Sequence, residues 1–269
     1  MLRLIPFLAG AASGAALLHE HRGRRAAERF VAAALETLLG AIDANDAQTG
    51  AHVRRVAHYA LILAEAADLD EREQRHVERV ALFHDIGKIY AALFDIVHDD
   101  TQLTAEERRA VATHPARGAA VLEPLRAFYP RLPEAVMAHH ERWDGRGYPR
   151  RLAGAQIPLA ARIVAIADTF DAVTHGRRYR RERTTHHAGS IIGKGRGTQF
   201  DPELVDLFLA PPVLESISDA MGADDAAPSR PSERRTGGAE PQVPDITFRW
   251  RPEIPSPRAR DRPSPEAIG

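Results

Sequence analysis

Five of the thirteen histidines in this chain, together with two aspartates, occur in an order that suits a metal site. A single histidine is usually a surface or packing residue. We assign eight to that class, namely His19, His21, His58, His76, His98, His175, His186 and His187. The others fall on or beside separate expected helices, which a helical fold could bring together. The candidate set is His52, His84, Asp85, His114, His139, His140 and Asp168.

The types of these residues restrict the chemistry. The chain has no cysteine, so imidazole and carboxylate are the available ligands, and they suit divalent iron, manganese or zinc. In the adjacent pair His84-Asp85, the aspartate can bridge two ions while the histidine binds one. Two metal ions about 3.5–4 Å apart can generate a nucleophile and stabilise charge on an attacked phosphorus atom. The set therefore predicts hydrolysis of a phosphoester.

Helices are the elements expected to position these residues. From Ala26 to about Ala210, apolar residues recur at three- and four-residue spacing, with almost no alternating strand pattern. Two apolar stripes indicate the first helices: Val53, Val56, Ala60 and Leu63, and then Val77, Val80, Ala81 and His84. A third helix is expected over Leu159–Val173, after Pro158. The predicted fold class is all-α, with one domain over residues 26–210.

The two ends of the chain differ from this domain in composition. Residues 4–18 are mostly apolar, but the stretch is shorter than the ~20 residues of a spanning helix. Three interpretations of residues 1–25 stay open: a docked helix, a membrane anchor followed by basic residues, or a cleaved secretory signal. Residues 211–269 are rich in Pro and Arg and poor in apolar residues, so we expect a disordered tail. Within it, Ile246–Trp250 is either an incidental apolar patch or a docking segment.

Charge and cysteine content limit the partners and the compartment. Lys and Arg number 36 and Asp and Glu 37, so the net charge of −1 gives no general attraction to a nucleic-acid polymer or an anionic membrane. The absence of cysteine fits a reducing compartment. We therefore expect a cytoplasmic protein, with membrane association through residues 4–18 as the alternative.

The motifs around the candidate ligands resemble those of the HD-GYP family, a branch of the HD superfamily of metal-dependent phosphohydrolases. The segment His84-Asp85-Ile86-Gly87-Lys88 is similar to the HD signature, and Asp144-Gly145-Arg146-Gly147-Tyr148-Pro149 to the GYP motif. His114-Pro115-Ala116-Arg117-Gly118 is similar to the HPxxG element, and Asp168-Thr169-Phe170-Asp171 to part of the long core helix. The resemblance covers roughly residues 33–210 and implies an HD-superfamily helical bundle.

The resemblance also implies roles for individual residues. All seven candidates would bind metal, with Asp85 bridging two divalent ions, iron or manganese. Lys88 would contact a substrate phosphate or assist proton transfer, and Asp46 matches an acidic residue beside the metals. Arg177 and Arg180 match phosphate-binding residues. Gly145 and Gly147 would permit positive φ and close approach in the GYP loop, where Tyr148 either stacks on a base or packs against the domain. Where trinuclear family members carry a glutamate, this chain has Gln48, which argues for two ions rather than three.

The implied activity is hydrolysis of cyclic di-GMP (c-di-GMP) to linear pGpG, with GMP as a further product to be tested. Two alternatives stay open. One is a catalytically weak module that binds the dinucleotide or protein partners, through the GYP loop or the C-terminal tail. The other is a phosphohydrolase for another nucleotide, such as a mixed cyclic dinucleotide.

Overall fold

The structure is a computed structural model that describes residues 27, 29–44, 46–89, 104–175 and 185–226, with side chains up to residue 221. Within these ranges the regular elements are α- and 3₁₀ helices, besides one isolated bridge between Arg196 and Phe200. The predicted all-α fold class is confirmed. In chain order, after a helix over residues 29–44, the elements are α2 (Ala47–Ala66), α3 (Glu71–Phe83), η1 (Ile86–Ile89), α5 (Ala105–Val111), α6 (His114–Leu122), η2 (Glu123–Leu125), α7 (Leu132–Met137), η3 (Gly154–Gln156), α8 (Leu159–Thr174), α9 (Thr185–Lys194), α10 (Pro202–Phe208) and α11 (Pro211–Ala226).

The limits of α2, which carries the first candidate ligand, follow from its local sequence. Asp46 caps the N-terminus, because its carboxylate accepts hydrogen bonds from the backbone N–H groups of Gln48 and Thr49 at 3.0 and 3.2 Å. After the other end, Asp68 has a φ of +55°, a left-handed conformation that cannot continue a helix. The stripe expected from the sequence, Val53, Val56, Ala60 and Leu63, is buried along α2.

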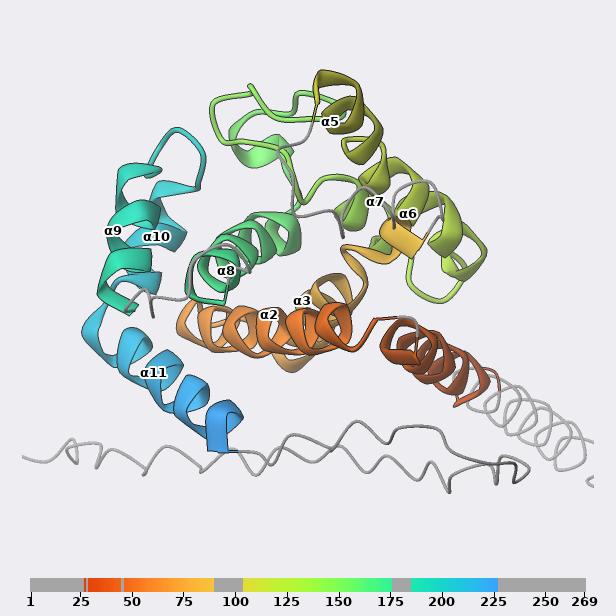
Figure 1. Ribbon diagram of the computed structural model, residues 1–269, viewed down its shortest axis with the longest axis horizontal. Helices are drawn as coiled ribbons and strands as arrows, with labels where there is room; N and C mark the ends of the chain where they lie inside the picture. The colour runs from red at the N-terminus through yellow and green to blue at the C-terminus, as the bar shows by residue number, and fades with distance from the viewer. Residues whose placement is uncertain (1–26, 28, 45, 90–103, 176–184, 227–269) are drawn as a thin grey trace, which may run out of the picture. The chain divides into compact units, whose positions relative to one another are not determined.

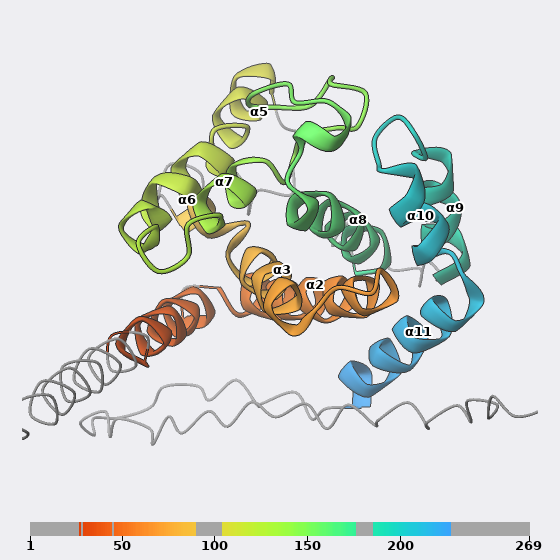
Figure 2. The ribbon, with the colours of Figure 1, turned by 180° about the vertical axis from the view of Figure 1, so that it is seen from behind.

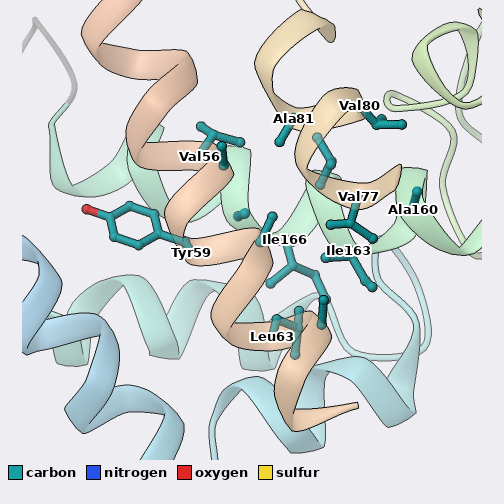
Figure 3. Close-up of a cluster of buried hydrophobic side chains, with 14 of the residues drawn as sticks. Val56, Tyr59, Leu63, Val77, Val80, Ala81, Ala160, Ile163 and Ile166 are labelled. Atoms are coloured by element: carbon teal, nitrogen blue, oxygen red, sulfur yellow. The ribbon is translucent and has the colours of Figure 1, made fainter. Parts of the chain in front are cut away.

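The core lies where α2, α3 and α8 pack against one another. Figure 3 shows apolar side chains from these helices brought together: Val56, Tyr59 and Leu63 of α2, Val77, Val80 and Ala81 of α3, and Ala160, Ile163 and Ile166 of α8. The Phe170 ring of α8 extends this cluster, with edge-to-face contacts to Tyr59 at 5.2 Å and to Phe208 of α10 at 5.4 Å. The core therefore fixes three ligand-bearing helices relative to one another.

The remaining helices flank this three-helix centre. Helix α6 packs on α7 and on η1, and α7 also contacts α3 and α8. Helices α9, α10 and α11 lie on the other side of the centre in Figure 1, and the view from behind in Figure 2 agrees. Their contacts reach α8 and α2. The candidate ligands thus come from the α2–α3–α8 centre and from the α6–α7 side.

The expected boundary of the C-terminal tail at residue 211 is wrong. Helix α11 begins at Pro211 and packs on α2 and α10. Its Val213, Ile217 and Ala220 are buried in the main core, at spacings of four and three residues. The sparse apolar residues of this stretch lie on one face, and that arrangement suffices to dock a helix. Residues 227–269, with the predicted docking segment Ile246–Trp250, lie outside the described residues.

The whole apolar N-terminal segment, residues 1–25, also lies outside the described residues. The helix over residues 29–44 packs on the core through Leu35 and Ile42, and Asp43 forms an ion pair with Arg54 of α2. Among the helices that the structure describes, none has the length and apolar character needed to cross a membrane. The anchor considered for residues 4–18 stays a prediction.

Candidate metal centre

The structure brings all seven candidate ligands into one cluster, in which His84, Asp85, His114 and His139 are buried and the other three are half-buried. His52 lies in α2 and Asp168 in α8, and His52 Nε2 is 3.4 Å from Asp168 Oδ1. His84 follows the end of α3, and its Nε2 is 3.8 Å from the same carboxylate oxygen. His114 opens α6, while His139 and His140 follow α7. The rings of these last three residues lie within 5.1 Å of one another, centroid to centroid.

Asp85 lies between two sets of histidines. Its Oδ2 is 3.5 Å from His84 Nε2 and 3.8 Å from His52 Nε2. Its Oδ1 is 3.2 Å from His114 Nε2 and 3.9 Å from His139 Nε2. The ligand atoms divide accordingly into two groups whose members are close enough to share an ion: His52, His84 and Asp85 in one, and His114, His139 and His140 in the other. This geometry is what a carboxylate bridging two ions requires.

Three of the histidines are oriented by their own helical turn. In each, Nδ1 contacts the backbone carbonyl three residues earlier: His84 with Ala81 at 2.6 Å, His114 with Val111 at 2.7 Å and His139 with Val136 at 2.6 Å. A carbonyl can only accept, so each Nδ1 is the protonated nitrogen. The lone pair of each neutral ring is therefore on Nε2, the atom that approaches Asp85.

The electrostatics favour neutral rings beside ionised carboxylates. Burial lowers the pKa of His84, lowers that of His139 strongly, and brings that of His140 to about 4. Burial alone would raise the pKa of Asp85, but the nearby Lys88 and His84 outweigh it and hold that pKa well below its usual range. His52 differs, since burial lowers its pKa but hydrogen bonds with Asp168 and Asp171 outweigh burial and raise it to about 10.

Two unsatisfied atoms show that the cluster fits cations. His84 Nε2 and Asp85 Oδ1 are buried and have no hydrogen-bond partner. A buried polar atom without a partner costs about 1–3 kcal/mol, so such atoms call for an explanation. One divalent ion in each group would satisfy these atoms, the first bound by His84 Nε2 and the second by Asp85 Oδ1, and the first would replace the proton that His52 otherwise holds. The imidazole and carboxylate donors suit iron, manganese or zinc.

Lys88 adds a cation at the edge of this cluster. It lies in η1, and its Nζ is 2.6 Å from Asp85 Oδ2. The side chain is 28% exposed, whereas Asp85 is 5% exposed. Lys88 thus connects the buried carboxylate with the side of the centre that solvent reaches.

The GYP loop is held against the centre by a residue that the sequence analysis missed. Glu141 is buried, and its carboxylate accepts hydrogen bonds from the backbone N–H groups of Arg150 at 2.6 Å and Leu152 at 3.0 Å. The Tyr148 ring packs on the His140 ring at 5.0 Å with an interplanar angle of 30°. Burial, followed by the charges of Asp85 and Asp168, raises the pKa of Tyr148 to about 12. Tyr148 therefore packs against the domain through His140, and its stacking on a base stays a prediction.

The two glycines of the loop meet the two requirements expected of them. Gly145 has a φ of +74°. At Gly147 the backbone passes so close to its neighbours that a Cβ would lie 2.4 Å from the Arg142 nitrogen and 2.5 Å from the Glu141 Cα. Backbone atoms at these distances cannot move aside without displacing the loop.

We expect Gly147→Ala to destabilise the protein by about 1–3 kcal/mol, the usual cost of overpacking, and to lower activity by shifting Tyr148 away from His140. Thermal unfolding and turnover measure the two effects. Gly40→Ala is the matched control, because a Cβ there meets nothing within 4 Å. Since Gly40 lies in a helix, its replacement should be neutral or slightly stabilising. Equal effects of both substitutions would contradict the argument.

Some expected site residues are placed differently or lie outside the described residues. Asp46, expected to act near the metals, caps α2, and its Oδ2 also accepts a hydrogen bond from the Thr49 hydroxyl at 2.6 Å. Capping accounts for this residue, and its catalytic role stays a prediction. Arg177 and Arg180 fall within residues 176–184, outside the described residues.

Two residues that were not among the candidate site residues contact the cluster, one directly and the other through the first. Asp171 of α8 is buried and contacts His52, and His175, assigned to the surface or packing class, contacts Asp171. The only signal in the sequence was the spacing of Asp171, three residues after Asp168, which places both on one face of a helix.

A model of the HD domain family matches residues 36–204, more than half of the chain. The chain belongs to this family. Over 173 residues it is 37% identical to 3'3'-cGAMP-specific phosphodiesterase 2 of Vibrio cholerae, covering 64% of this chain and 33% of that protein. Over 176 residues it is 38% identical to the cyclic di-GMP phosphodiesterase response regulator RpfG of Xanthomonas campestris, covering 65% of this chain and 46% of that protein. With these relatives, the expected HD-GYP membership is confirmed.

A solved structure supports the same fold. The crystal structure of a cyclic GMP-AMP-specific phosphodiesterase of V. cholerae aligns with a TM-score of 0.52 and 22% identity, over 72% of this chain and 53% of that chain. The chain spans less than half the length of the two curated relatives described above, at 33% and 46%.

Proposed function

We propose that this protein is a metal-dependent phosphodiesterase that hydrolyses a cyclic dinucleotide, with c-di-GMP as its substrate and linear pGpG as the first product. The observation that carries the proposal is the position of Asp85, whose two oxygens each approach a different set of histidine Nε2 atoms. The names of its relatives, which describe cyclic-dinucleotide phosphodiesterases, support the substrate class.

In this proposal His52, His84 and Asp168 hold one ion, His114, His139 and His140 hold the other, and Asp85 contributes an oxygen to each. Two such ions, when bound, supply a nucleophile at neutral pH and stabilise charge on the phosphate. The neutral rings of His84, His139 and His140 and the ionised Asp85 prepare the site for cations, because ligands must be deprotonated before they bind.

Residues outside the ligand set act on the substrate. The Lys88 ammonium, which contacts Asp85 at the exposed edge, would bind an anionic phosphate or donate a proton to the leaving oxygen, and its exposure supports this role. Arg177 and Arg180 remain proposed phosphate contacts through their guanidinium groups. The packed Tyr148 keeps His140 in place on the side of the GYP loop.

A second substrate, 3'3'-cGAMP, is the alternative that the comparisons favour. One relative is named as specific for it and is 37% identical to this chain, much like the c-di-GMP phosphodiesterase at 38%. The two dinucleotides differ in one base, so the choice depends on contacts with that base.

Product analysis tests the proposal. The purified full chain, loaded anaerobically with Fe²⁺ or Mn²⁺, is incubated separately with c-di-GMP and 3'3'-cGAMP. We expect linear pGpG from c-di-GMP, formed faster than any product of 3'3'-cGAMP. Faster cleavage of 3'3'-cGAMP would assign the alternative substrate. Binding of c-di-GMP without turnover by metal-loaded protein would instead identify a binding module.

The proposed centre holds two ions, not three, because of Gln48. This residue lies one turn before His52 on α2 and is exposed. An amide oxygen is neutral and binds transition-metal ions more weakly than a carboxylate, so it would not retain a third cation. Elemental analysis of anaerobically purified protein should give close to two metals per chain, and Gln48→Glu should raise the value. Three tightly held metals in the unmodified chain would contradict this prediction.

A further inference from the structure

The buried carboxylate of Asp171 is the centre of a contact network behind the ligand cluster. It is 2% exposed and lies on α8, one turn after Asp168. Its Oδ2 is 2.7 Å from His52 Nδ1, and its two oxygens accept hydrogen bonds from Arg55 Nε at 2.6 Å and Nη2 at 2.9 Å. His175 Nδ1 lies 3.1 Å from Oδ1.

His52 depends on this network in a way that the other buried ligands do not. His84, His114 and His139 are each oriented by a carbonyl of their own turn. The partner of His52 Nδ1 instead comes from a different helix, 119 residues further along the chain. A contact of this kind exists only when α2 and α8 are packed together. The orientation of His52 is therefore set by tertiary structure, through one carboxylate.

The anchoring of Asp171 indicates that its carboxylate is held for this purpose. Arg55 lies one turn after His52 on α2, and its guanidinium donates a hydrogen bond to each oxygen of Asp171. The arginine and the histidine thus bind the same carboxylate from one helix face. With both oxygens engaged by Arg55, Oδ2 keeps a lone pair aimed at His52 Nδ1. This fixes the proton on Nδ1 and leaves Nε2 free to face Asp85 and Asp168.

We propose that Asp171 is a positioning residue that orients His52 and so raises the metal affinity of the half of the centre formed by His52, His84 and Asp168. The inference rests on the metal centre of the proposed function. It differs from a purely structural role, in which loss of Asp171 would lower stability without favouring either half of the centre. An ionised partner also makes the imidazole a more basic ligand than a carbonyl partner does.

The test is the substitution Asp171→Asn in the full chain, with Zn²⁺ as the probe and a competing chelator to measure affinity and stoichiometry. An amide can donate to His52 Nδ1, which would move the ring proton to Nε2 and block it as a ligand. We expect one of the two bound Zn²⁺ ions to be held about 10–100-fold more weakly and the other to be unaffected. Asp201→Asn is the matched control, since Asp201 is likewise buried and paired with an arginine, Arg162. It should leave both Zn²⁺ affinities unchanged.

A second background keeps the result interpretable if Asp171→Asn also lowers stability. In a His52→Ala chain, Zn²⁺ binding at the same half is already weakened. Adding Asp171→Asn should then change the remaining affinity little, because Asp171 acts through the missing ring. Zn²⁺ affinities that fall equally at both sites, or that fall as far again in the His52→Ala background, would overturn the inference. So would two unchanged sites in Asp171→Asn. These measurements need no dinucleotide, so an unmodified chain that binds two Zn²⁺ ions but hydrolyses no cyclic dinucleotide would end the proposed function and leave this test valid.

Discussion

Replacing Asp85 with asparagine should reduce phosphodiesterase activity by at least about 10²–10³-fold, the loss that follows removal of a single stabilising group from an active site. The effect should lie at or beyond that range, because Asp85 approaches both histidine sets and its loss weakens both metal positions. Metal content, measured by elemental analysis on the same sample, should fall well below two ions per chain.

The fold should survive this substitution. Asparagine has nearly the volume of aspartate, and the cavity it would fill is unchanged. Circular dichroism should therefore report the same helical content. Asp206→Asn provides the control, since Asp206 is exposed and pairs with Arg196 at the surface. That variant should keep full activity and metal content. Retained turnover in Asp85→Asn, with metals quantified, would refute the bridging role.

Truncation of the C-terminus should show that α11 contributes to stability and that the residues after it contribute little. Val213 and Ile217 are buried in the main core, and burial of such side chains contributes about 1.5–3 kcal/mol each. A chain ending at Ala210 should therefore lose about 3–6 kcal/mol, out of roughly 5–15 kcal/mol for a typical domain. For a domain of this size we expect the melting temperature to fall by roughly 10–20 °C.

A chain ending at Ala226 is the direct comparison, and it should melt close to the temperature of the full chain. Within α11, Ile217→Ala should cost about 2–5 kcal/mol, while Glu215→Ala, at an exposed position, should cost little. Thermal unfolding followed by circular dichroism measures all four proteins. A large loss of stability in the chain ending at Ala226 would show that residues 227–269 contribute to the fold.

The sequence predicted the helical core well because its signal is periodic. Val53, Val56, Ala60 and Leu63 recur at helical spacing, and all four are buried along α2. The expected boundary at residue 211 is wrong because it rests on composition instead, and residues 211–269 are rich in proline and arginine and poor in apolar residues. The average composition of this stretch does not reveal Val213, Ile217 and Ala220. Only their spacing in the sequence shows that they share one face of a helix. A helix that docks through only a few apolar residues changes the local composition too little for composition to mark where the domain ends.

The candidate ligands could be found from sequence, but the residues that hold them could not. A histidine beside an aspartate in a motif indicates a ligand type, whereas a carboxylate that supports a ligand is defined by its neighbours in space. Asp171 and Glu141 differ from other acidic residues only in what lies beside them, a ring nitrogen of His52 and two backbone N–H groups of the GYP loop. Asp46 shows the opposite case. Its contacts with Gln48 and Thr49 cap α2, and the catalytic role suggested by its position in the sequence stays a prediction.

The contacts between imidazole Nδ1 atoms and carbonyls of the same turn have a mechanical consequence. The rings of His84, His114 and His139 are each hydrogen-bonded to a backbone carbonyl of their own turn, so each ring should move together with its helix. An exchange of one ion for another of different radius should then be accommodated by small translations of α3, α6 and α7, while the rings keep their rotamers. The distances between helices would then change with the size of the ion, while the direction of each Nε2 lone pair relative to its own helix would stay the same.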